Sequence, residues 1–192
     1  NSKVGAVQPK IMYNDNREMI WSAGGRYSPL FTLAPTKGHQ EIDNGQFNNV
    51  SSNEWISCCA FLVRSSILRE IGLEDEIFFY GCFDDVDLSF RIRKAGFKLS
   101  YCPDSVIYHD VMSAVKSEEG KVGNIKPFFH YLVTRNHWFF IRKHTKWIFI
   151  PTSIIYQFAR FFVYVSAFAA MGRFTKLKAF THGFAHGMIK PL

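Results

Sequence analysis

The sequence predicts an α/β fold, in which part of a mixed β-sheet with flanking helices precedes an all-helical, amphipathic C-terminal region. Apolar runs at residues 4–12 and 55–63 are typical of buried strands, and residues 84–96 have the pattern of a helix. Three longer helical patterns follow, at residues 128–143, 152–171 and 175–188. We therefore expect a sheet-bearing part over residues 1–126 and a helical part over residues 127–192.

The first strands are interrupted by residues that disfavour sheet pairing. The run at residues 4–12 contains Pro9, so we expect this strand to end near the proline. Residues 20–53 are rich in Gly, Pro, Asn and Ser, which is typical of loops. The run WISCCAFLV at residues 55–63 is apolar almost throughout, which predicts a strand that is buried on both faces.

Two helices and two short strands are expected next. Ser65 or Ser66 is suited to cap a short helix that ends at Gly72. The segment 84–96 predicts a second helix, because acids occupy its first turn and bases its last, with a glycine as the stop. Pro103 then separates two predicted strands, over residues 97–102 and 105–109.

The formal net charge of +7 is distributed unevenly along the 192 residues. Residues 1–120 carry 12 basic and 16 acidic side chains, whereas residues 121–192 carry 11 basic and no acidic ones. The second segment also holds 17 of the 32 Phe, Trp and Tyr residues. No nucleic-acid-binding motif accompanies this charge, so we expect no nucleic-acid partner. A chain that is 47% hydrophobic and 20% charged is also not intrinsically disordered.

The chain has four cysteines, which is too few for a disulfide scaffold at this length. They form no CxxC pair, and the spacing does not favour a zinc site. We expect free thiols in a reducing compartment at all four positions, Cys58, Cys59, Cys82 and Cys102.

Asp84, Asp85 and Asp87 form the most concentrated group of ionisable side chains. A purely structural interpretation is that they favour the positive end of the helix dipole. The catalytic alternative is that the aromatic residues before them lower the local dielectric and raise a carboxylate's proton affinity, as a general base requires. Successive helix residues point about 100° apart, so the three carboxylates cannot serve one proton transfer equally.

Two other positions have a structural and a functional interpretation. His109 ends a predicted strand, where it is either a structural histidine or a metal ligand. Arg135, next to Asn136 on a predicted helix, is either a surface residue or a group that holds a phosphate by a charge-assisted contact.

The C-terminal region contains two uncharged runs, residues 147–159 and 161–172, separated by Arg160. A narrow polar stripe lies at helical spacing, formed by Ser153, Gln157, Arg160 and Tyr164. Basic residues flank this amphipathic helix, which favours attachment to an anionic membrane surface. A spanning or re-entrant segment, and packing against protein without lipid, are the alternatives.

The order of these motifs resembles the C-terminal portion of a family 2 glycosyltransferase of the rhamnosyltransferase-like kind, over roughly residues 4–144. The most specific match is IGLEDEIFFYGCFDDVDLSFRIRKAGFKLSYCPDSVIYH. Shorter matches are VGAVQPKI, WSAGG, DNGQF, WISCCAFLVR and YLVTRN. The resemblance implies a GT-A-type mixed sheet.

The resemblance also implies roles for individual residues. Asp85 matches the acceptor-activating base, Asp84 stands where Glu is usual, and Asp87 matches a supporting acid. His109 matches a metal-binding histidine. Cys58 stands where a small glycine near the acceptor pocket is usual. Substrate-binding positions are further implied at Trp55, Arg135 and Asn136.

The resemblance implies an inverting transfer of a sugar from a nucleotide-sugar donor to a lipid-linked or polysaccharide acceptor, with a divalent cation, Mg or Mn. The nucleotide-binding half and its Asp-x-Asp motif are not in this sequence, which begins Asn-Ser-Lys without Met. We therefore expect a fragment that is inactive by itself. We also expect a cytoplasmic location on the inner face of the cell membrane, and homo-oligomers are plausible. The alternative function is a non-catalytic module that binds a membrane or a partner.

Overall fold

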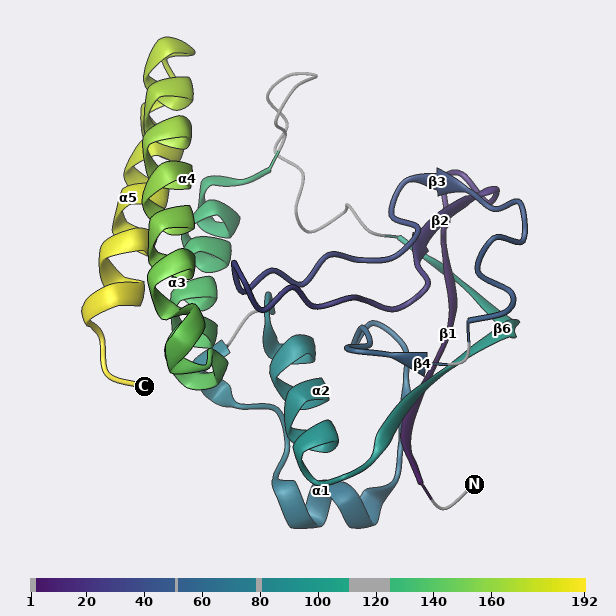
Figure 1. Ribbon diagram of the computed structural model, residues 1–192. Helices are drawn as coiled ribbons and strands as arrows, with labels where there is room; N and C mark the ends of the chain where they lie inside the picture. Colours follow the sequence, from purple (N-terminus) through teal and green to yellow (C-terminus); the bar gives the residue numbers. More distant parts are fainter. Residues whose placement is uncertain (1–2, 51, 79–80, 111–124) are drawn as a thin grey trace. The chain divides into compact units, whose positions relative to one another are not determined.

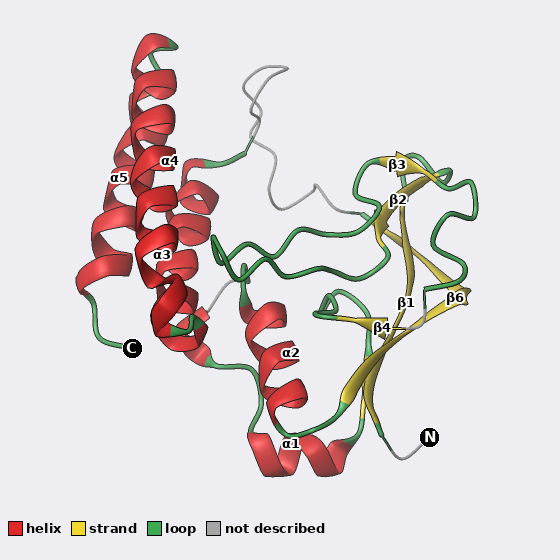
Figure 2. Ribbon diagram, in the orientation of Figure 1, coloured by secondary structure: helices red, strands yellow, loops and turns green. Residues whose placement is uncertain are grey.

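The computed structural model describes residues 3–50, 52–78, 81–110 and 125–192, and it has the expected α/β class (Figure 1). The described part contains one mixed sheet, which has six strands, and it also contains five α-helices. The last three helices form the C-terminal region (Figure 2). The chain divides into two compact units, each built from several segments. Unit 1 comprises residues 1–27, 34–76 and 84–111, and unit 2 comprises residues 28–33, 77–83 and 112–192.

The sheet of unit 1 is centred on β1 (Val4–Tyr13) and β6 (Lys98–His109), which are parallel neighbours. The strand order is β3-β2-β1-β6-β4, and β5 also pairs with β1. All other pairings are antiparallel. The shorter strands are β2 (Met19–Ser22), β3 (Glu41–Ile42), β4 (Ser52–Asn53) and β5 (Leu62–Val63).

Both prolines lie within strands, so the expected breaks at Pro9 and Pro103 are wrong. β1 continues through Pro9 to Tyr13, and β6 is a single strand. Pro9 pairs with Cys102, whereas the next residue of β1 pairs with Val106, so three residues of β6 have no counterpart in β1. A bulge of this kind interrupts the ladder where proline lacks an N–H group, and the pairing then resumes.

The expected strand over residues 55–63 is also wrong, because only Leu62 and Val63 pair in the sheet. The preceding backbone is held by side chains instead. The Ile56 N–H donates to Ser89 Oγ at 3.0 Å, and the Ser57 N–H donates to Gln8 Oε1 at 2.7 Å. The run is therefore an irregular segment that is buried only at residues 55–57, and Cys59 and Leu62 are exposed.

The helices of unit 1 are α1 (Ser65–Ile71) and α2 (Asp84–Lys94), which confirms both expected helices. The end of α1 at Gly72 is confirmed, and this glycine has a φ of 85°. The expected serine cap is wrong, because Arg64 occupies the N-cap and no side chain caps the helix. A core cluster joins these helices to the sheet, formed by Ala6, Ile56, Ile67, Leu88, Ile92 and Leu99.

Unit 2 contains the three expected long helices, α3 (Pro127–His144), α4 (Ile150–Ala170) and α5 (Phe174–Ile189). Among the described residues, short 3-10 turns also occur at Glu76–Phe78, where unit 1 passes into unit 2 along the chain, and at Trp147–Phe149. The helices α3 and α5 approach closely, because a Cβ atom at Gly183 would overlap the backbone of Tyr131. Gly187 has the same relation to the backbone of Arg135.

Candidate active site

The three acidic residues occupy the first turn of α2, as the sequence predicts. Their environments differ. Asp85 is half-buried, and its Oδ1 accepts a hydrogen bond of 2.8 Å from the Val86 N–H. Asp87 is completely buried, whereas Asp84 is half-buried. The three carboxylates are thus separated by the turn of the helix into groups with different chemistry.

Asp85 has the electrostatic character of a general base. Burial, and secondly the negative charge of Asp84, raise the pKa of Asp85 to about 7. Hydrogen bonds from the backbone of Val86 and Cys58 act in the opposite direction, but they are the smaller effect. Burial also raises the pKa of Asp84. A carboxylate with a pKa near neutrality is ionised in part at pH 7 and is more basic than an ordinary aspartate.

Asp87 is held in an ion pair inside unit 1. Its Oδ2 accepts a hydrogen bond of 2.8 Å from Arg91 Nε, one helical turn later. The guanidinium of Arg91 also donates to the carbonyl oxygens of Ile71, Gly72 and Leu73. Asp87 therefore positions the start of α2 against the end of α1, which agrees with a supporting role rather than a second base.

Cys58 and Asp85 are brought together in unit 1. The Cys58 N–H donates a hydrogen bond to the Asp85 carboxylate. The Cys58 side chain is half-buried, and burial with the charge of Asp85 raises the pKa of its thiol. The residue that stands at the expected acceptor pocket thus contacts the candidate base.

Trp55 lies within the fold rather than at a surface. Its side chain is 5% exposed, and its indole Nε1–H donates to the Arg26 carbonyl at 3.0 Å. The indole ring fills the space where a Cβ atom at Gly25 would lie. These contacts favour a packing role for Trp55, and its substrate-binding role stays a prediction.

His109 ends β6 in an aromatic cluster that the sequence did not reveal. Its ring packs against that of Trp21 in a T-shaped arrangement with centroids 5.1 Å apart, and Trp21 in turn contacts His39. Tyr13, which pairs with His109 in the sheet, also packs against His39. The motif WSAGG contains Trp21, but pairing between distant strands determines which rings meet. The metal-binding role of His109 stays a prediction.

A complete metal site is not found among residues 3–50, 52–78, 81–110 and 125–192. No group of three or more His, Cys, Asp or Glu side chains in these ranges could hold an ion. The described residues therefore do not by themselves fit a divalent cation, which in proteins requires several oxygen or nitrogen donors.

Arg135 and Asn136 lie on α3 in unit 2, where they hold the segment 77–83. The Asn136 Nδ2 donates to the carbonyl oxygens of Gly81 and Cys82 at 3.0 and 2.8 Å. Arg135 Nε donates to Asn136 Oδ1 at 2.8 Å. Residues 81, 82 and 83 all have φ between 68° and 82°, so this pair fixes an uncommon backbone. Asp84 follows this segment directly in the sequence.

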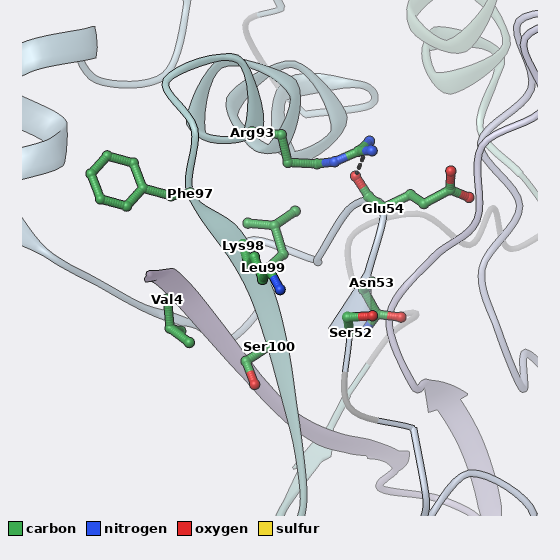
Figure 3. Close-up of a pocket in the computed structure, with 9 residues that line it drawn as sticks. All are labelled: Val4, Ser52, Asn53, Glu54, Arg93, Phe97, Lys98, Leu99 and Ser100. Carbon is green, nitrogen blue, oxygen red and sulfur yellow. Dashed lines mark hydrogen bonds between the residues drawn. The ribbon is translucent and has the colours of Figure 1, made fainter. Parts of the chain in front are cut away.

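A cavity of about 590 Å³ in unit 1 lies at the other end of α2 (Figure 3). It is lined by β4, by the start of β6 and by Arg93, whose guanidinium donates to the Glu54 carbonyl at 3.2 Å. Asp85 and Arg93 are eight residues apart, which is about 12 Å along a helix. This cavity is therefore separate from the acidic cluster.

Comparison with known proteins identifies a relationship for part of the chain. A segment of 76 residues, 38% of the chain, is 34% identical to the pre-mycofactocin glycosyltransferase of Mycobacterium tuberculosis, in two strains. This segment is similar to a glycosyltransferase. The chain spans 16% of the length of these curated relatives. No family model matches the sequence.

Proposed function

We propose that this chain carries the acceptor-activating part of an inverting glycosyltransferase. The observation that carries the proposal is Asp85, a half-buried carboxylate at a helix start with its pKa raised to about 7. The similarity to a glycosyltransferase over 76 residues supports the same general chemistry. A sugar would pass from a nucleotide-sugar donor to a hydroxyl of a lipid-linked or polysaccharide acceptor.

The proposed step needs one base. Asp85 takes the proton of the acceptor hydroxyl while that oxygen forms a bond to the anomeric carbon of the donor. The bond from the anomeric carbon to the nucleotide diphosphate breaks on the opposite face, so the configuration inverts. The hydroxyl loses its proton only as the new bond forms, so a base with a pKa near 7 is sufficient. Asp84 raises the basicity of Asp85 through its negative charge.

The enzyme family, the metal ion and the roles of three further residues extend this proposal. We propose a GT-A, family 2 enzyme of the rhamnosyltransferase-like kind that uses Mg or Mn, with His109 as one ligand. Since the described residues hold no complete metal site, the other ligands would come from outside them. Arg135 and Asn136 would act by positioning the segment that precedes Asp84.

The test is sugar transfer by the full product of the gene that encodes this sequence. The protein is incubated with membranes and a panel of nucleotide sugars, and release of the nucleotide diphosphate is measured. Asp85→Asn should abolish transfer while donor binding is nearly unchanged, because the amide cannot accept the proton. Turnover within about tenfold of the wild type would refute the assignment of Asp85 as the base.

The matched control is Asp104→Asn, which removes an exposed carboxylate from β6 in the same unit. This variant should retain full transfer. If no sugar is transferred by the full wild-type product with any donor, the non-catalytic alternative is favoured instead. We also expect the 192-residue chain alone to be inactive, and transfer by this chain would contradict that expectation.

A further inference from the structure

The helix α4 presents its apolar side outward. Together with the preceding 3-10 turn it forms the segment Trp147–Ala170, which is long and apolar enough to cross a membrane. Only 11% of its most apolar window is buried, so it is not the core helix of unit 2. The exposed side chains are large, with Trp147 81%, Ile155 68% and Phe162 65% exposed.

The polar side of α4 points inward and makes hydrogen bonds inside unit 2. Ser153 Oγ lies 2.7 Å from Thr32 Oγ1, and Gln157 Nε2 donates to His137 Nδ1 at 2.8 Å. His137 Nε2 in turn donates to the Thr32 carbonyl at 2.7 Å. Burial, and secondly the positive charge of Arg160, lower the pKa of His137 to about 3, so this imidazole is neutral at physiological pH.

Helix geometry places these two sides opposite each other. Residues two positions apart are rotated by about 200° around an α-helix. Ser153 and Gln157 each lie two positions from Ile155, and Arg160 lies two positions from Phe162. Ile155 and Phe162 are seven positions apart and share one side. The polar groups, together with the contacts of the Phe161 ring with α5, therefore hold the helix on unit 2. Ile155 and Phe162 lie on the opposite, exposed side.

The charged residues of the sequence segment that contains this apolar side are all basic. Residues 121–192 contain 11 basic residues and no acidic one. Exposed bases lie before and after α4, namely Lys146 and Lys178. An apolar side bordered by cations complements a bilayer that has anionic headgroups. A second protein surface would need acidic residues at both ends of the helix.

The packing also distinguishes lying on a membrane from crossing it. If α4 crossed the bilayer, the hydrogen-bonded partners of its polar side would have to enter the hydrocarbon with it. Those partners include His137 on α3, whose neighbour Asn136 holds the segment 77–83. Breaking this network would leave several buried polar groups without partners in hydrocarbon.

We propose that the outward side of α4 lies in the surface of an anionic membrane, with Ile155 and Phe162 in the boundary between headgroups and acyl chains. Lys146 and Lys178 contact the headgroups at the two ends of the helix. The polar side remains on unit 2, so the helix is interfacial and does not span. This attachment does not depend on the proposed sugar transfer. It would place the chain on the inner face of the cell membrane, where anionic lipids are found.

The test is flotation of the purified 192-residue chain with phosphatidylcholine vesicles that contain phosphatidylglycerol. The wild type should float at low salt and be released by high salt or alkaline carbonate. Ile155→Asp with Phe162→Asp should weaken partition by at least about a hundredfold, because two exposed apolar side chains are lost. Lys146→Gln with Lys178→Gln should weaken it by about thirtyfold.

The matched control changes two equally exposed apolar residues of unit 1, Leu62→Asp with Leu73→Asp. This variant should float like the wild type, and circular dichroism should show that all variants are folded. Flotation that resists carbonate would overturn the interfacial proposal in favour of a spanning helix. Wild-type chain that stays unbound, and forms a dimer that Ile155→Asp with Phe162→Asp dissociates, would overturn it in favour of a protein interface. Equal binding to pure phosphatidylcholine would overturn the role of the lysines.

Discussion

Replacing Asp85 by Asn should change the stability of the protein in a way that depends on pH. Burial and the charge of Asp84 raise the pKa of Asp85 from its usual 3.8 to about 7. Between these two values the folded chain holds a proton that the unfolded chain has released. The free energy of unfolding of the wild type therefore falls as pH rises through this window.

The size of the effect follows from the shift. Each pH unit inside the window lowers the free energy of unfolding by about 1.4 kcal/mol. Between about pH 5 and about pH 7 the free energy of unfolding of the wild type falls by about 3 kcal/mol in total. Above the pKa of Asp85 in the folded chain this ionisation causes no further fall. Asn at position 85 does not ionise, so this loss is absent from the variant. The stability of Asp85→Asn relative to wild type should thus increase by about 3 kcal/mol from about pH 5 to about pH 8.

Urea unfolding followed by circular dichroism at the two pH values measures this difference. Asp104→Asn serves as the control for loss of a negative charge, since Asp104 is exposed on β6. If the relative stability of Asp85→Asn is the same at both pH values, the pKa of Asp85 is not raised. The argument for Asp85 as a base with a pKa near neutrality would then be refuted.

Two further predictions concern packing and the ion pair behind the acidic cluster. Gly183→Ala should lower the stability by about 2 kcal/mol, since its Cβ would overlap the Tyr131 backbone, although alanine favours helices. An unchanged or higher melting temperature would contradict the close approach of α3 and α5. Arg91→Ala should lower the free energy of unfolding by about 3 to 5 kcal/mol, because the buried carboxylate of Asp87 loses its ion pair with Arg91. Urea titration measures this loss of stability. If the loss is as small as that expected for replacing an exposed arginine by alanine, the ion pair contributes little to stability.

Local sequence patterns predicted the helices well. The start of α2 is determined by residues within one turn of each other, with three acids followed by apolar positions and then bases. The same holds for α3, α4 and α5, whose ends lie within a few residues of those expected. These signals are local, because capping, dipole and periodicity involve neighbours in sequence.

The errors arise where distant residues decide the structure. The run at 55–63 has the composition of a strand, but Gln8 and Ser89 take the hydrogen bonds that a neighbouring strand would make. A bulge lets β6 continue through Pro103, and its presence depends on the register with β1. The polar stripe of α4 was visible in the sequence, whereas its inward direction depends on Thr32 and His137.

For the site, the sequence identified Asp85 and its neighbours as candidates. It could not separate the roles of the three acids, because burial and the pairing of Asp87 with Arg91 are tertiary features. The aromatic cluster of Trp21, His39 and His109 was missed for the same reason, since its members come from different strands and loops.

Unit 2 is built from segments that lie far apart in the sequence, and this has a consequence for how the protein folds during synthesis. Thr32 contacts His137 and Ser153, which are 105 and 121 residues later in the chain. At about 5 to 20 residues per second, the ribosome adds Ser153 about 6 to 24 s after Thr32. Until then the segment 28–33 lacks its contact with Ser153, so the network that joins it to α3 and α4 stays incomplete until α4 has been synthesised. A nascent chain stalled before α4 should therefore depend on chaperones to keep its earlier apolar segments from aggregating.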